Sequence, residues 1–149
     1  MMTEPTIDKL RALKLFAMIT AWMAQREDPS LAELSFDERL ALLVDAETLA
    51  RDNKRLARLL HGAKLRIPTA CLEDLDLGAK RGLDRPLIRS LSTGRWVLDH
   101  QNILITGMTG VGKSFLACAL GQLACRQGHK VLWRERLQKV QGTRASHAA

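Results

Sequence analysis

This 149-residue sequence has few aromatic residues, few cysteines and no long apolar run, and each of these features excludes a class of protein or site. Aromatic residues make up 4% and tyrosine is absent, so a core must be built mainly from leucine, alanine, isoleucine and valine, which favours helices and α/β layers. The three cysteines, Cys71, Cys118 and Cys125, show no C-x-x-C pairing, which argues against a zinc site and fits reduced thiols in the cytosol. No apolar run reaches the roughly 18 residues of a membrane span. We therefore expect a cytoplasmic protein that does not enter a membrane.

The net charge of +7 is unevenly distributed along the chain. Acidic residues are in excess over residues 1–50, and basic residues are in excess from residue 51 onward. A basic balance confined to the later part of a chain suggests an anionic partner, most often nucleic acid. The alternative is a solvated surface whose positive charge only aids solubility.

Two amphipathic helices are predicted in the first half. The first covers residues 5–26, where apolar residues recur at helical spacing after Pro5. The second starts at a capping box formed by Ser35 and Glu38 and runs to about His61, before Gly62. Its apolar row is expected to pack on the first helix; the members of this row are Leu42, Ala46, Leu49, Leu56 and Leu60.

Four basic residues follow one another near the end of the second helix: Arg51, Lys54, Arg55 and Arg58. Spacings of three, four and seven residues place them on one helix face. They are candidates for contact with a DNA phosphate backbone. The alternative is a solvent-exposed face whose cations complement the negative end of the helix, and Asp52 dilutes the positive charge.

The chain changes character after residue 66. Glycine and proline residues break residues 67–94 into short pieces, with one short helix expected around Arg85 to Leu91 and a second over residues 93–99. Two β-prone runs, residues 102–106 and 129–133, flank a helix that ends near Gln127. We expect an α/β fold: a helical N-terminal domain (1–66), a linker (67–99), and the first, incomplete βαβ part of a P-loop NTPase parallel sheet (100–149).

A complete phosphate-binding motif lies between the first run and the helix. It satisfies G-x-x-x-x-G-K-[ST] at every fixed position, in the order Gly107, Met108, Thr109, Gly110, Val111, Gly112, Lys113, Ser114. The glycines let backbone amides approach phosphates, and the N-terminus of the following helix favours negative charge. Lys113 supplies a cation between phosphate oxygens, and the Ser114 hydroxyl is a hard ligand for Mg²⁺. The motif predicts ATP and Mg²⁺ binding; the alternative is a glycine-rich turn with an incidental lysine.

Hydrolysis needs more than this loop. An acidic residue at the end of a neighbouring strand has to hold Mg²⁺ and orient water. The only carboxylate side chain after Ser114 is that of Glu135, between Arg134 and Arg136. We expect Glu135 to be a surface residue paired with these arginines, so no catalytic residue is assigned.

The succession of segments resembles the IstB-like ATP-binding proteins, which are transposition helper ATPases of bacterial insertion sequences, related to the replicative helicase loaders of the AAA+ class. The resemblance covers roughly residues 7–140. It rests on the run from Asn102 through the motif to Arg126, together with residues 35–38, 51–56 and 72–76. Met108 and Phe115 differ from other members only at positions that vary in the family.

The resemblance implies an ATP-dependent DNA-binding oligomer that delivers its cognate transposase to target DNA. Members continue with further strands that carry the Walker B acid, a sensor and an arginine finger, so the resemblance implies a chain truncated before its hydrolytic residues. One alternative is a non-catalytic DNA- or transposase-binding helical module with a vestigial nucleotide site. A P-loop kinase is disfavoured, because no substrate-binding half is present.

Overall fold

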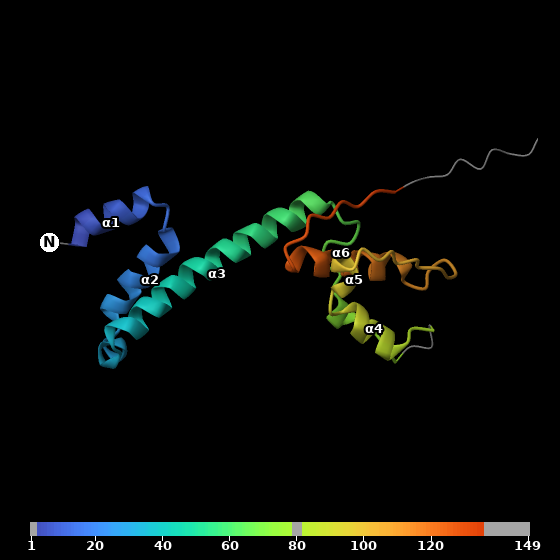
Figure 1. Ribbon diagram of the computed structural model, residues 1–149, viewed down its shortest axis with the longest axis horizontal. Helices are drawn as coiled ribbons and strands as arrows, with labels where there is room; N and C mark the ends of the chain where they lie inside the picture. Colours follow the sequence, from blue (N-terminus) through green and yellow to red (C-terminus); the bar gives the residue numbers. More distant parts are fainter. Residues whose placement is uncertain (1–2, 79–81, 136–149) are drawn as a thin grey trace, which may run out of the picture.

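The computed structural model describes residues 3–78 and 82–135, and every regular element in these ranges is helical. No helix among them is both long and apolar enough to cross a membrane. The long helix α3 connects the N-terminal helices at one end with a second unit, built around α6, at the other (Figure 1). In chain order the elements are α1 (Thr3–Ala12), α2 (Phe16–Glu27), η1 (Pro29–Glu33), α3 (Phe36–Ala63), η2 (Leu72–Asp74), α4 (Arg85–Leu91), α5 (Arg95–Leu98) and α6 (Lys113–Arg126).

The predicted first helix is in fact two helices. After α1 the backbone turns at Lys14, which adopts a left-handed conformation with φ of 60°. The amide of Leu15 donates to the carbonyl of Leu10 at 2.9 Å, and that of Lys14 to Arg11 at 2.8 Å. This pair of bonds is a Schellman motif, which normally uses glycine at the left-handed position. Because lysine occupies that position here, the sequence carries no visible signal for the break.

The second helix begins as predicted. Ser35 accepts a hydrogen bond from the Glu38 amide at 3.3 Å, and the Glu38 carboxylate accepts one from the Ser35 amide at 2.8 Å. The Ser35 amide, with a smaller contribution from its hydroxyl, lowers the pKa of Glu38. The helix ends at Ala63, two residues beyond the predicted end at His61, because Lys64 and not Gly62 takes the left-handed position, with φ of 51°.

A buried carboxylate joins α2 to α3. Leu15, which precedes α2, has no side-chain acceptor for the free amides at the start of that helix. Glu47 from the middle of α3 takes this role: it accepts from the Met18 amide at 3.1 Å and from the Arg51 guanidinium at 2.9 Å. The Arg51 bond, followed by the Met18 amide, lowers the pKa of Glu47 below its usual value. One acidic residue therefore caps a helix 29 residues away in sequence.

Glu47→Gln is expected to lower the thermal stability of the α2–α3 pair at pH 7. The wild-type carboxylate has a pKa lower in the folded chain than its usual 4.5, so its contribution is present above that value and is lost as pH falls through the folded pKa. The difference in Tm between wild type and variant should therefore shrink on going from pH 7 to about pH 3. Circular dichroism melts at both pH values measure this, with the exposed Glu33→Gln as control. An equal effect of the two substitutions would contradict the capping role.

The leucine row of α3 does not pack on one partner throughout. Leu56 and Leu60 lie against the core near α6, whereas Leu42 and Leu49 are 45% and 62% exposed. The prediction that this row packs on the first helix is therefore wrong: its first half is largely exposed, and its second half packs near α6. The contacts of α3 with α2 instead involve Glu47 and the backbone of Arg39. The Arg39 carbonyl accepts a hydrogen bond from the side-chain amide of Gln25 at 2.9 Å.

The buried core lies at the other end of α3 and is centred on α6. The inward residues of α6 pack against the segment from Ala63 to Leu72 and against Ile88 of α4. Cys118 and Cys125 are almost completely buried and act as small core residues. The buried members of α6 are Leu116, Cys118, Ala119, Leu120, Leu123, Ala124 and Cys125. This packing holds the first turn of α6, where the phosphate motif ends.

The predicted parallel sheet is absent from the described residues, so the α/β assignment is wrong and the fold there is helical. Both β-prone runs line one hollow of about 440 Å³ over α6, and no backbone hydrogen bond joins them. Strands must lie about 4.8 Å apart to form a ladder. The amide of Trp133 donates instead to the Ala63 carbonyl, at 2.8 Å. Ile103 and Ile105 pack on the core, while Leu104 between them is 89% exposed.

Candidate nucleotide site

The phosphate loop, residues 107–114, connects the extended run over residues 102–106 to the start of α6. Gly112 precedes the helix with φ of 98° and ψ of 19°, a conformation in which any other residue would be strained. Gly107 is needed for a different reason: a Cβ atom added there would lie 3.2 Å from the Cγ2 of Val111. Gly107 and Gly112, the two fixed glycines of the motif, thus serve the tight path of the loop.

Lys113 folds its side chain back over the loop. Its ammonium group donates to the carbonyl of Gly107 at 2.7 Å and to that of Met108 at 2.6 Å. These carbonyls hold the cation at the mouth of the loop, with its stem half-buried in the first turn of α6. An ammonium carries three donors, so one donor remains for a further oxygen in this geometry.

The backbone of the loop also carries amides that have no hydrogen-bond partner. Among the described residues, the amides of Thr109, Gly110, Val111 and Gly112 donate no hydrogen bond within ordinary distance and angle limits. They lie next to the N-terminus of a 14-residue helix, whose dipole is positive at this end. A group of unpaired amides, a helix N-terminus and a lysine make a site for a multiply charged anion.

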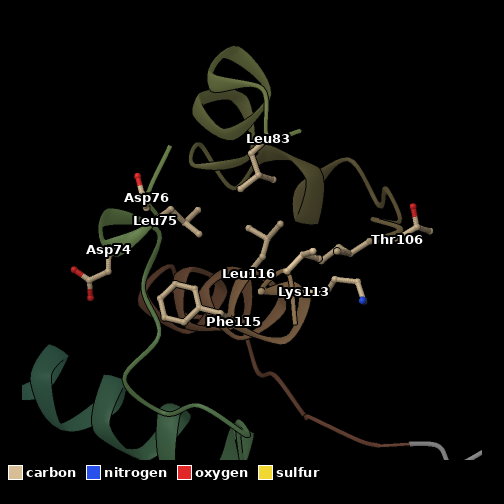
Figure 2. A pocket seen from close by; sticks show the side chains of 11 residues that line it. Asp74, Leu75, Asp76, Leu83, Thr106, Lys113, Phe115 and Leu116 are labelled. Atoms are coloured by element: carbon tan, nitrogen blue, oxygen red, sulfur yellow. The ribbon is translucent and has the colours of Figure 1, made fainter. Parts of the chain in front are cut away.

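A pocket of about 270 Å³ adjoins the loop. Figure 2 shows Leu75, Leu83, Phe115 and Leu116 around its apolar part, with Lys113 and Thr106 at the opposite side. Asp74 and Asp76 line its margin; the first accepts from the Cys71 thiol at 3.0 Å and the second from the Gly78 amide at 2.9 Å. The pocket therefore combines an apolar region with a cationic end.

Sequence reasoning missed this pocket. Residues 73–76 are visible in the sequence as an acidic patch, and Leu83 as a single apolar residue among turn formers. Neither signal places them beside a loop that starts more than 20 residues later. Only the packing of η2 on α6 brings Leu75 next to Phe115 and Leu116.

Ser114 is the residue for which the sequence predicts a role as magnesium ligand. It is the second residue of α6, half-buried, beside Lys113. The described residues contain no group of three or more histidine, cysteine or acidic side chains that could hold a metal ion by themselves. Glu135 is an exposed surface residue, as expected, although its partner is Arg66 at 3.2 Å.

The four basic residues of α3 share one face, as their spacing predicts. They line a shallow hollow of about 400 Å³. Their surroundings nevertheless differ: Arg51 is tied to the buried Glu47, and the Arg55 guanidinium lies against Gly128 at the end of α6. Lys54 and Arg58 are exposed and have no ion pair with another described residue.

A comparison with models of known protein families shows the family of this chain. The model of the IstB-like ATP binding protein family matches residues 8–147, nearly the whole chain. The chain belongs to this family. A relative from an insertion sequence of Pseudomonas fluorescens, named for ATP binding, is 47% identical over 147 residues, or 99% of this chain.

Other relatives of this IstB-like chain carry similar names. An insertion-sequence protein of Sinorhizobium fredii named for ATP binding is 44% identical over 133 residues, or 89% of this chain. One from Mycobacterium tuberculosis is 31% identical over 142 residues, or 93% of this chain. The chain spans 64% of the Pseudomonas relative and 53% and 55% of the other two.

Proposed function

We propose that this chain binds ATP with Mg²⁺ at residues 107–114 and serves as a DNA-associated helper in the transposition of a bacterial insertion sequence. The observation that carries the nucleotide part is that the Lys113 ammonium and the unpaired amides of residues 109–112 lie together in one short loop at the N-terminus of α6. Family membership supports the same assignment.

The arrangement supports one orientation of the nucleotide. The triphosphate is the charged part of ATP and fits the loop, where amides and Lys113 neutralise it. The adenine and ribose then fall to the adjoining pocket, where Leu75, Leu83, Phe115 and Leu116 offer apolar contact. Ser114 provides one oxygen ligand to the Mg²⁺ that neutralises the phosphates. The proposal is for binding: within the described residues, we assign no side chain to the activation of water.

The helper role rests on charge and on the relatives. The basic face of α3 offers cations for a DNA phosphate backbone. The relatives are insertion-sequence proteins, which supports the cognate transposase as a partner and the bacterial cytoplasm as the location. We also propose that members of this family act as homo-oligomers on DNA.

Titration of the chain with a fluorescent ATP analogue in the presence of Mg²⁺ tests the nucleotide assignment. We expect saturable binding that unlabelled ATP displaces and that AMP displaces far less, because the loop recognises the β- and γ-phosphates. Omitting Mg²⁺ should weaken binding. DNA binding without any nucleotide binding would refute this assignment and favour the alternative, a helical DNA- or transposase-binding module with a vestigial loop.

A further inference from the structure

The basic face of α3 does not end on that helix. Arg55 lines the hollow of α3 and also a second hollow of about 240 Å³, which it shares with Arg126 at the end of α6. Arg126 in turn lines a third hollow of about 510 Å³ with Arg85 and Arg89 of α4. Because neighbouring hollows share a lining arginine, the three adjoin one another in a row that runs from α3 past the end of α6 to α4.

We propose that this row of hollows, the basic track, is a single DNA-binding path that follows the phosphate backbone across all three helices. The basic track consists of Arg51, Lys54, Arg55, Arg58, Arg126, Arg85 and Arg89. The inference rests on the DNA-binding part of the proposed function and extends it to α4 and α6, which sequence reasoning left out.

The length of the track favours nucleic acid over a small anion. Arg51 and Arg58 are seven residues apart on one helix, which corresponds to about 10 Å along its axis. The track then continues over two further elements. A single phosphate or carboxylate would occupy one of these hollows, whereas a polynucleotide presents a phosphate at regular intervals along its whole length.

Local helix electrostatics explains only part of the track. Arg55 and Arg126 lie at the C-terminal end of α6, where cations are stabilised by the helix dipole. Arg89 lies in the last turn of α4, where the dipole of that helix also favours a cation, whereas Arg85 begins α4 and has no such explanation. Neither arginine forms an ion pair with another described residue. Both are exposed on α4. Unpaired arginines at the rim of a hollow remain available for phosphate contacts.

Acidic residues interrupt the track at defined points. Glu73 accepts from Arg126 at 2.6 Å, and this arginine lowers the pKa of Glu73. Asp52 lines the second hollow. A bound phosphate backbone would compete with Glu73 for Arg126, so the Glu73 carboxylate should oppose DNA binding.

The experiment measures DNA affinity by fluorescence anisotropy over a series of salt concentrations. Arg85→Ala with Arg89→Ala should weaken binding at least several-fold and reduce the slope of log K against log salt by about two, one for each lost phosphate contact. Lys9→Ala with Arg26→Ala removes the same charge from the exposed N-terminal helices and should change little. Glu73→Gln should strengthen binding, whereas a merely structural role for its ion pair predicts a loss.

Failure of this inference can be told apart from failure of the proposed function. If Lys54→Ala with Arg58→Ala weakens DNA binding but the α4 variant matches wild type, the track is refuted while DNA binding by α3 stands. Poly-glutamate is a second probe. If the α4 variant binds poly-glutamate more weakly than wild type but binds DNA equally well, the track is also refuted and α4 is assigned to an acidic peptide. Nucleotide titration of each variant reports on the ATP site, and circular dichroism confirms its folding.

Discussion

Lys113→Ala is expected to weaken ATP binding by about 10- to 100-fold while leaving the helix content of the chain unchanged. A hydrogen bond to a charged group is worth roughly 1.5–3 kcal/mol, and each 1.4 kcal/mol corresponds to a tenfold change in affinity. The ammonium already lies at the loop, held by the carbonyls of Gly107 and Met108. Two of its three donors are used there, which leaves the third for a phosphate oxygen. Titration with the fluorescent ATP analogue measures the change.

Lys130→Ala is the matched control for this substitution. Lys130 is an exposed lysine of the same unit, and it lines the hollow over α6 rather than the nucleotide pocket. Its removal changes the net charge equally and should leave ATP affinity within about twofold, because exposed charges act weakly at a distance in physiological salt. Equal losses in the two variants would show that general charge, and not the position of Lys113, governs binding.

Leu120→Ala is expected to destabilise the unit around α6 by about 2–5 kcal/mol, as is usual when a buried leucine is truncated. Leu120 is 4% exposed on the inward face of α6, among the core residues that hold this helix in place. Since α6 carries Lys113 and Ser114 in its first turn, ATP affinity should fall with stability. Urea denaturation gives the free energy of unfolding, and nucleotide titration at low temperature shows how much binding survives in the folded fraction.

Leu104→Ala makes the same chemical change at a site that is 89% exposed. We expect a cost within about 0.5 kcal/mol, the usual range for surface substitutions. This control also tests whether residues 102–106 form a buried strand. In a central parallel strand covered on both faces, truncating Leu104 would cost as much as truncating Leu120. Comparable losses for the two variants would contradict the exposed position of Leu104.

Several features of this chain could be predicted from local sequence because local chemistry determines them. The start of α3 follows from a reciprocal pair of hydrogen bonds between Ser35 and Glu38, which needs no other part of the chain. The loop before α6 follows from glycines at positions where a side chain would be strained or would collide. Each pattern spans only a few residues, so it can be recognised in the sequence without knowledge of the tertiary structure.

Other features involve partners that the sequence does not place. Glu47 caps α2 from 29 residues away, and Leu75 joins the nucleotide pocket through the packing of η2 on α6. The two β-prone runs have the composition of buried strands, but composition cannot supply a neighbouring strand at hydrogen-bonding distance. They instead line one hollow over α6 without pairing.

The sequence by itself determined the phosphate loop, the helix that follows it and the shared face of the four α3 cations, since each depends on backbone geometry over a few turns. Only the tertiary structure decided that the described residues form helices without a sheet, and that an apolar pocket adjoins Lys113. It also decided that the α3 cations adjoin those of α6 and α4. The physical reason is that burial, pairing and charge proximity depend on residues distant in sequence, which only packing brings together.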